Sequence, residues 1–280
     1  SKDERALELI ELLVKSHPLE AKAYSIKADF LLKKGDEDGA LLAYRNALKY
    51  DKSQYPIWNQ VLIMLYQRGQ FSELYEESKV CLELFPTMST VYLLKGVSAN
   101  QLEKFDEAVE VLTSGKEMVI NDPALLAEFY GQLGEANFGV GNLVEGNLNY
   151  KKALEIDSRS NLLKNNYAYR LANTKQNFDL AKSLIEKAMI SSPLNGQYVD
   201  TYGWIFFQEG QYKKALEHFT NANELSPDDK LTIEHLGDVN SKLGNVSLAL
   251  KWWNKALEYV DSDSNLEEKI SNKKYHERAK

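Results

Sequence analysis

Apolar side chains recur along the chain at spacings of three and four residues, the spacing of one face of an α-helix. The stripe Ala40, Tyr44 and Ala47 returns three more times with the same spacing. The later copies are Gly146, Tyr150 and Ala153; Ala215, Phe219 and Ala222; and Ala249, Trp253 and Ala256. Helix-favouring residues dominate between these stripes, and only 6 prolines and 15 glycines interrupt them. The pattern predicts an all-α protein built from repeated helices.

A second apolar stripe lies upstream of three of these copies and ends in a small residue. Its pairs Leu133-Gly134, Tyr202-Gly203 and Leu236-Gly237 each precede another glycine by seven residues. Those later glycines are Gly141, Gly210 and Gly244, at positions expected for a turn. Each repeated unit is therefore expected to contain two helices joined by a short turn.

These stripes resemble the tetratricopeptide repeat (TPR), whose 34-residue pattern runs W-x2-L-G-x2-Y, then A-x3-F, then P. The resemblance implies a right-handed superhelical solenoid of helix–turn–helix TPR units. Seven repeats are placed at 21–54, 55–88, 89–122, 127–160, 162–195, 196–229 and 230–263. Pro123 to Leu126 and Asn161 are interpreted as insertions before the fourth and fifth repeats, with a lengthened helix beginning at Pro123.

Both ends of the chain fit the same scheme. Residues 1–20 match only the second helix of a repeat, so we interpret the chain as a fragment of a longer protein. Residues 264–280 are expected to form a solvated C-terminal capping helix with Leu266 and Ile270 turned onto the last repeat. The lysines of this tail, Lys269 among them, alternate with glutamates and are expected to face solvent.

Composition excludes several classes of function. The formal net charge of −7 argues against nucleic acid as a partner, and no apolar run is long enough to span a membrane. Four histidines lie in separate segments without metal-ligand spacing, and the single cysteine, Cys81, replaces a buried alanine of a second helix. We therefore expect no enzyme activity, no metal and no cofactor.

In TPR proteins, positions 2, 5, 9 and 12 of the first helix commonly line the concave surface that binds peptides. In the stretch DTYGWIFF, Tyr202, Gly203 and Phe206 are assigned to the core, whereas Asp200, Trp204 and Phe207 fall on these inner positions. Packing against the adjacent repeat is the alternative for those three. The candidate groove residues in the whole chain are Asn59, Tyr66, Glu135, Phe138, Asn166, Arg170, Asn173, Asp200, Trp204, Phe207, Glu234 and Asp238.

Acidic side chains outnumber basic ones on these inner positions. Lys22 and Arg170 are the bases, and the acids are Asp29, Glu128, Glu135, Asp200, Glu234 and Asp238. An acidic groove with aromatic side chains favours a partner that carries basic and apolar residues. The alternative is that these acids only reflect an acidic composition.

The sequence thus predicts a non-catalytic scaffold or adaptor that binds a protein or peptide in its groove. Two alternatives stay open: a regulatory or substrate-recruiting arm of a larger enzyme or assembly machine, and a self-associating structural module that forms homo-oligomers. The last four repeats look most like bacterial envelope-type TPR adaptors. That resemblance implies the cell envelope as location, on the periplasmic side and lipid-anchored in the full-length form, with the cytoplasm as the alternative.

Overall fold

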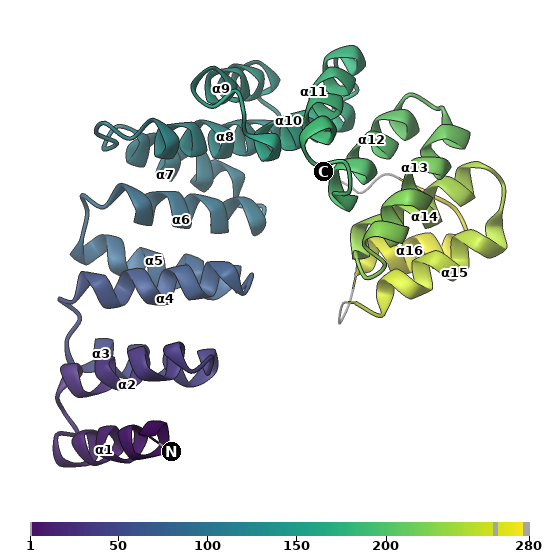
Figure 1. Ribbon diagram of the computed structural model, residues 1–280. Coiled ribbons are helices and arrows are strands. Elements are labelled where there is room, and N and C mark those ends of the chain that lie inside the picture. Colours follow the sequence, from purple (N-terminus) through teal and green to yellow (C-terminus); the bar gives the residue numbers. More distant parts are fainter. Residues whose placement is uncertain (1, 260–262, 277–280) are drawn as a thin grey trace. The chain divides into compact units, whose positions relative to one another are not determined.

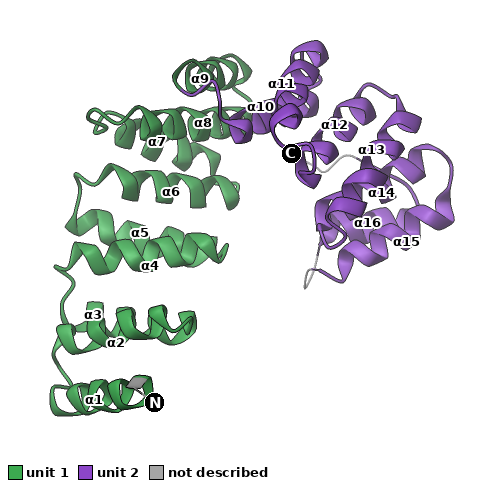
Figure 2. Ribbon diagram, viewed as in Figure 1, with its two compact units in different colours: residues 1–156 green, residues 157–280 purple. Residues whose placement is uncertain are grey.

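A computed structural model of the protein describes residues 2–259 and 263–276, and all regular elements in these ranges are α-helices (Figure 1). The prediction of an all-α repeat fold is confirmed. The chain divides into two compact units, residues 1–156 and residues 157–280 (Figure 2). We describe each unit by itself.

Unit 1 stacks helical hairpins upon one another, each made of a first and a second helix (Figure 2). Its helices are α1 (Lys2–Ser16), α2 (Ala21–Lys33), α3 (Glu37–Tyr50), α4 (Tyr55–Gln67), α5 (Phe71–Leu84), α6 (Ser89–Gln101), α7 (Phe105–Lys116), α8 (Pro123–Gly139) and α9 (Leu143–Ile156). The long helix α8 begins at Pro123, as expected. The Asp122 carboxylate caps it by accepting from the Leu125 N–H at 3.0 Å.

Unit 2 repeats the same hairpin and adds a short helix at its end. Its helices are α10 (Asn161–Asn173), α11 (Phe178–Ser191), α12 (Gly196–Gln208), α13 (Tyr212–Leu225), α14 (Lys230–Lys242), α15 (Val246–Leu257) and α16 (Ser264–Asn272). Leu266 of α16 is fully buried, and Ile270 packs against the same core cluster as Trp253. The expected contacts of these two residues with the last repeat are therefore observed.

Small residues let the two helices of a hairpin approach each other closely. A Cβ atom added to Gly134 of α8 would lie 2.6 Å from the ring of Tyr150 in α9, and one added to Gly203 would lie 2.8 Å from Phe219. The turn that follows also needs glycine, because Gly141 has φ +79°. The two glycines of each sequence stripe thus have separate physical causes, close packing for the first and turn conformation for the second.

The extra residue of the fifth repeat lies in its turn and not before its first helix. Three residues separate the two helices of the other hairpins, but four, residues 174–177, separate α10 from α11. Asn161 is the first residue of α10, and the Ser160 hydroxyl caps the helix by accepting from the Leu163 N–H. Ala168, fully buried, takes the place of the close-packed glycine. The interpretation of Asn161 as an insertion is therefore wrong, because the additional residue lies in the turn. The fifth repeat begins at Asn161 and not at residue 162, so each inner position of α10 lies one residue earlier than expected.

Candidate functional site

The aromatic stretch DTYGWIFF forms most of α12 and is almost entirely buried. Asp200, Trp204 and Phe207 are 3%, 8% and 4% exposed, so they do not stand free as anchors for a partner. Trp204 stacks on Tyr169 of α10 and on His235 of α14, with ring centroids 6.4 and 4.2 Å apart. In the structure, Asp200, Trp204 and Phe207 therefore pack within the protein, which was the alternative to a groove that binds a partner.

The acids at position 9 accept hydrogen bonds from aromatic residues of the second helix of the same repeat. Tyr44 Oη donates to Asp29 at 2.6 Å, and Tyr150 Oη donates to Glu135 at 3.0 Å. Trp253 Nε1 donates to Asp238 at 2.8 Å. Each donor lies fifteen residues after its acceptor. These carboxylates satisfy polar atoms of large, buried rings, which would otherwise lose hydrogen bonds to water on folding.

Repeats whose second helix has no such donor carry an apolar residue at position 9. Leu112 and Phe219 stand where Tyr44 does, and Val97 and Trp204 then stand where Asp29 does. The acid at position 9 is thus coupled to the donor of its own hairpin.

A second set of contacts ties each first helix of unit 2 to the one before it. Nδ1–H of His235 in α14 donates to the two carboxylate oxygens of Asp200 in α12, at 2.9 and 3.0 Å. Both side chains are buried. Burial alone would lower the pKa of His235, but the Asp200 charge and hydrogen bond, helped by Asp238 and Glu234, raise that pKa above its usual value. His235 therefore holds its proton more firmly than a free imidazole does, because Asp200 stabilises the protonated ring.

The same joint recurs one repeat later with a lysine. Lys269 Nζ of α16 donates to Glu234 at 2.8 Å and to the two oxygens of Asp238 at 2.8 and 3.0 Å. All three side chains are buried. Burial and the neighbouring charge of Glu234 raise the pKa of Asp238, whereas Lys269 opposes that rise.

Two expectations about charge are corrected by these contacts. Five of the six inner acids, Asp29, Glu135, Asp200, Glu234 and Asp238, already have a partner within the chain, so they do not form a row of unpaired charges for a basic ligand. Lys269 does not face solvent but forms ion pairs with two of these acids, Glu234 and Asp238. For the buried acids Asp200, Glu234 and Asp238, the physical reason is that a buried carboxylate needs a donor or a cation nearby.

The shift in α10 also changes which of its residues face inward. Tyr169, one helical step from the expected Arg170, stacks on Trp204, and Asn173 Oδ1 accepts from Trp204 Nε1 at 2.6 Å. Asn166 and Arg170 are half-buried, and Asn166 Oδ1 accepts from the amide of Asn165. Whether any of these side chains contacts a partner stays a prediction.

Sequence reasoning missed His235 and Lys269, which hold the joints of unit 2. The signal was present, because each base lies 35 residues after the acid that it pairs with, close to the length of one repeat. Asn100, at inner position 12 of α6 in unit 1, also has a partner within the chain, because its amide donates to the backbone and side-chain oxygens of Gln132 at 3.0 Å.

The inner face of α4 in unit 1 is the accessible part of the predicted groove. Asn59, Ile63 and Tyr66 follow each other at spacings of four and three and thus share one face of this helix. Asn59 and Ile63 are half-buried, and Tyr66 is 46% exposed. Leu32, the corresponding position-12 residue of α2, is half-buried. We call Leu32, Asn59, Ile63 and Tyr66 the α2–α4 face.

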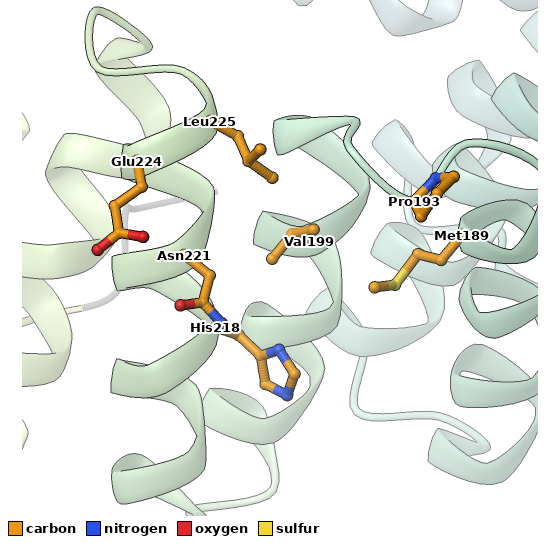
Figure 3. A pocket seen from close by; sticks show the side chains of 7 residues that line it. All are labelled: Met189, Pro193, Val199, His218, Asn221, Glu224 and Leu225. Carbon is orange, nitrogen blue, oxygen red and sulfur yellow. The ribbon is translucent and has the colours of Figure 1, made fainter.

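A cavity of about 380 Å³ opens between α11, α12 and α13 in unit 2 (Figure 3). Its lining residues are Met189, Pro193, Val199, His218, Asn221, Glu224 and Leu225. His218 stacks on Phe206 with ring centroids 5.3 Å apart, and burial lowers the pKa of this histidine. The cavity is lined mainly by apolar groups, and none of its residues belongs to the predicted groove.

Three further observations bear on chemistry in residues 2–259 and 263–276. No group of three or more His, Cys, Asp or Glu side chains is arranged there to hold a metal ion. No helix of this part of the chain combines the length and the apolar character needed to cross a bilayer. Cys81 is fully buried, and burial raises the pKa of its thiol to about 12.

The hairpins, their close-packed small residues and the joints between them define a tetratricopeptide repeat solenoid. Two family models of the tetratricopeptide repeat match this chain, one over residues 4–56 and the other over residues 198–229. The chain therefore carries tetratricopeptide repeats, as the sequence stripes indicated. A crystal structure of a tetratricopeptide repeat protein from Parabacteroides merdae has the same fold, with a TM-score of 0.75 at 14% identity. The match covers 90% of this chain and 98% of that chain.

Two relatives are similar in sequence. A TPR repeat-containing protein of Methanocaldococcus jannaschii is 23% identical over 240 residues, which are 85% of this chain and 31% of the relative. The type IV pilus assembly protein PilF of Pseudomonas aeruginosa is 27% identical over 130 residues, which are 46% of this chain and 51% of the relative. The chain thus spans about a third and about half of the lengths of these relatives.

Proposed function

We propose that the protein is a non-catalytic scaffold that binds a peptide or protein partner on the α2–α4 face. The observation that carries the proposal is the exposure of Tyr66. Of the four aromatic residues expected in the groove, Phe138, Trp204 and Phe207 are buried and Tyr66 is exposed. An exposed tyrosine offers a large apolar ring and a hydroxyl at low entropic cost, which suits it as an anchor in an interface.

Three further residues at inner positions of α2 and α4 support a peptide as occupant. Ile63 and Leu32 present partly exposed apolar groups, and Asn59 carries an amide of the kind that pairs with an extended backbone. Stacked hairpins hold these side chains on rigid helices, so little ordering is required on binding.

The absence of catalysis is part of the proposal, and it is supported by the burial of two reactive side chains, Cys81 and His235. The Cys81 thiol is buried, with its pKa raised to about 12, which disfavours the thiolate. His235 is held by Asp200 in the interior, where a substrate has no access to it.

A phage-displayed library of random peptides provides the probe. Peptides selected on the full chain are labelled, and their affinities are measured by fluorescence polarisation. The variant Tyr66→Ala/Ile63→Ser is expected to weaken binding at least about tenfold, since removal of a central anchor commonly costs more than 1 kcal/mol. The matched control is Leu42→Ala, which removes a side chain that is 64% exposed on the second helix α3. Equal affinities for both variants would show that the peptides bind elsewhere.

The location of the protein is also a proposal. The name of the Pseudomonas relative refers to assembly of type IV pili, a structure of the cell envelope. Together with the likeness of the last repeats to envelope adaptors, this supports a scaffold at the envelope of a bacterial cell. Fractionation of source cells with an antibody against the chain tests it, and recovery in the cytoplasmic fraction alone contradicts it.

A further inference from the structure

Helix α16 takes the place that the first helix of another repeat would take. It begins at Ser264, 34 residues after α14 begins at Lys230. Both helices have an aspartate as N-cap: Asp229 accepts from the Thr232 N–H and Asp263 from the Leu266 N–H. However, α16 has 9 residues whereas α14 has 13, and it ends at Asn272, directly before Lys273, whose φ is +53°. The segment is therefore a shortened copy of a first helix.

A lysine fixes this segment to two buried acids of α14. Lys269 Nζ lies within 3.0 Å of Glu234 and Asp238, both of which are inner positions of the last repeat. Asp238 also accepts from Trp253 Nε1 at 2.8 Å. If Lys269 leaves, two buried carboxylates lose the ammonium group that donates to both of them, and the site then favours another cation.

Beyond Lys273 the chain runs across the ends of α12 and α14. The Tyr275 N–H donates to Ser241 Oγ at 2.9 Å, and the Tyr275 ring meets Phe207 edge to face at 5.3 Å. Lys242 Nζ lies 4.4 Å from the centre of the same ring. Ser241 and Phe207 are both position-12 residues of the predicted groove. Residues 263–276 thus contact inner positions of both of the last two repeats: Glu234, Asp238 and Ser241 in the last and Phe207 in the one before it.

Few apolar contacts hold this segment in place. Leu266 is fully buried, but Ile270 and Tyr275 are only half-buried, and residues 271–274 are exposed. A helix of this length is not stable in isolation, because isolated helices shorter than about 12 residues are marginal in water. Its order therefore depends on docking, and its opening is expected to cost less free energy than global unfolding.

We propose that residues 263–276 are a displaceable internal ligand, and that the surface beneath them binds a partner segment whose short helix carries a lysine and whose chain turns after that helix to place an aromatic residue six positions after the lysine. The buried acids Glu234 and Asp238 select the lysine, and Phe207 with Ser241 selects the aromatic residue and its backbone. The inference rests on the proposed role as a peptide-binding scaffold, but it concerns unit 2 and does not involve the α2–α4 face.

Hydrogen exchange of the unmodified full chain gives the first test. Amides in the second half of α16 are expected to exchange at least about 100-fold faster than amides in the middle of α14, because α16 opens by itself. Equal exchange rates in the two helices would overturn the proposal, since the segment would then open only when the whole unit unfolds. This measurement needs no variant and no external partner.

Binding in trans gives the second test, with a labelled synthetic peptide of residues 263–276 as probe. The full-length variant Lys269→Gln/Tyr275→Ala, with its internal segment weakened, is expected to bind this peptide at least about tenfold more tightly than the unmodified chain does. A peptide with Lys269→Gln should bind the variant at least about tenfold more weakly. A peptide with Lys273→Gln is the matched control, since that lysine is exposed, and it should bind as well as the original.

The proposal is overturned if the variant binds all three peptides equally or binds none of them. Neither result changes the affinities expected for the phage-selected peptides, with or without the Tyr66→Ala/Ile63→Ser substitutions. A failure of this inference is therefore distinguishable from a failure of the proposed function.

Discussion

The hydroxyl of Tyr44 donates a 2.6 Å hydrogen bond to the carboxylate of Asp29, fifteen residues earlier in the same repeat. The ring of Tyr44 is buried, whereas Asp29 is at the surface. The hydrogen bond raises the pKa of Tyr44, after burial, which is the larger cause. The same hydrogen bond joins Tyr150 to Glu135 in another hairpin. The tyrosine–carboxylate pair is therefore a repeated element of the hairpin and not an isolated surface contact.

Replacing Tyr44 by Phe is expected to lower the free energy of unfolding by about 1 kcal/mol, the usual net value of one hydrogen bond. The loss stays modest because water can solvate the exposed Asp29 after the change. Urea denaturation followed by circular dichroism measures it. Tyr66→Phe is the control, since the exposed Tyr66 is expected to change stability by less than about 0.5 kcal/mol.

A double substitution tests whether donor and acid are coupled. Tyr44→Phe/Asp29→Val reproduces the apolar pairing seen between Leu112 and Val97 and is expected to recover part of the loss from Tyr44→Phe. The coupling free energy should be about 0.5 to 1 kcal/mol in a double-mutant cycle. Strictly additive effects would mean that the two side chains act independently.

Stability is expected to depend on pH through His235. Its pKa is raised in the folded protein, so the imidazole binds its proton more tightly there than in the unfolded chain. This stabilisation is full below the unfolded pKa of about 6.5 and is lost as pH rises through the folded pKa. Asp238, whose pKa is also raised, acts with the same sign, but its range begins near pH 4.

The measurement is the difference in unfolding free energy between the unmodified chain and His235→Gln at several pH values. We expect this difference to shrink as pH rises from about 5.5 to about 9, because the unmodified chain loses its imidazolium–carboxylate pair. A difference that is constant over this range would show that His235 keeps one charge state throughout.

Substitution of Gly237 by Ala should be severely destabilising. A Cβ at this position would overlap the indole of Trp253, which is fully buried and held by its hydrogen bond to Asp238. Overpacking of this kind costs about 1 to 3 kcal/mol. Gly244→Ala is the comparison, because it meets no atom within 4 Å but is strained by its φ of +83°. Melting temperatures of the two variants should rank Gly237→Ala lower, and the reverse order would show that Trp253 can move aside.

Cys81 is expected to resist thiol reagents in the folded protein. Its side chain is fully buried, and the pKa of about 12 leaves almost no thiolate near neutral pH. Labelling by a disulfide reagent should be slow in buffer and should accelerate with urea in parallel with global unfolding. Rapid labelling without denaturant would mean that α5 opens locally.

The fold was predictable because each hairpin carries the same few constraints. Gly134 and Gly203 mark where helices touch, Gly141 marks a turn, and the apolar stripes mark the core. The turn after α10 was misassigned because Ala168 replaces the glycine and Lys175, with φ +53°, replaces the turn glycine. Without the two glycines, the sequence does not reveal whether an extra residue lies before the first helix or in the turn after it.

The candidate site was harder to predict because exposure is a property of neighbours. Trp204 at position 9 and Tyr66 at position 12 are both inner positions of a repeat, yet Tyr169 and His235 cover Trp204 while Tyr66 stays accessible. The acids were misread for a related reason: one repeat considered alone shows Asp200 and Glu234 without the bases of the next. Comparison of residues about one repeat apart would have indicated both ion pairs.

The pairing of Asp200 with His235, and of Glu234 with Lys269, also determines how such a protein can change over generations. An acid and its base belong to different repeats, so duplication or exchange of one repeat along its 34-residue boundary would separate them. The two pairs span residues 200–235 and 234–269 and overlap, so every crossover between Asp200 and Lys269 separates at least one acid from its base. The last two repeats and α16 are therefore expected to be inherited together, and engineers who shuffle repeats should cut outside this block.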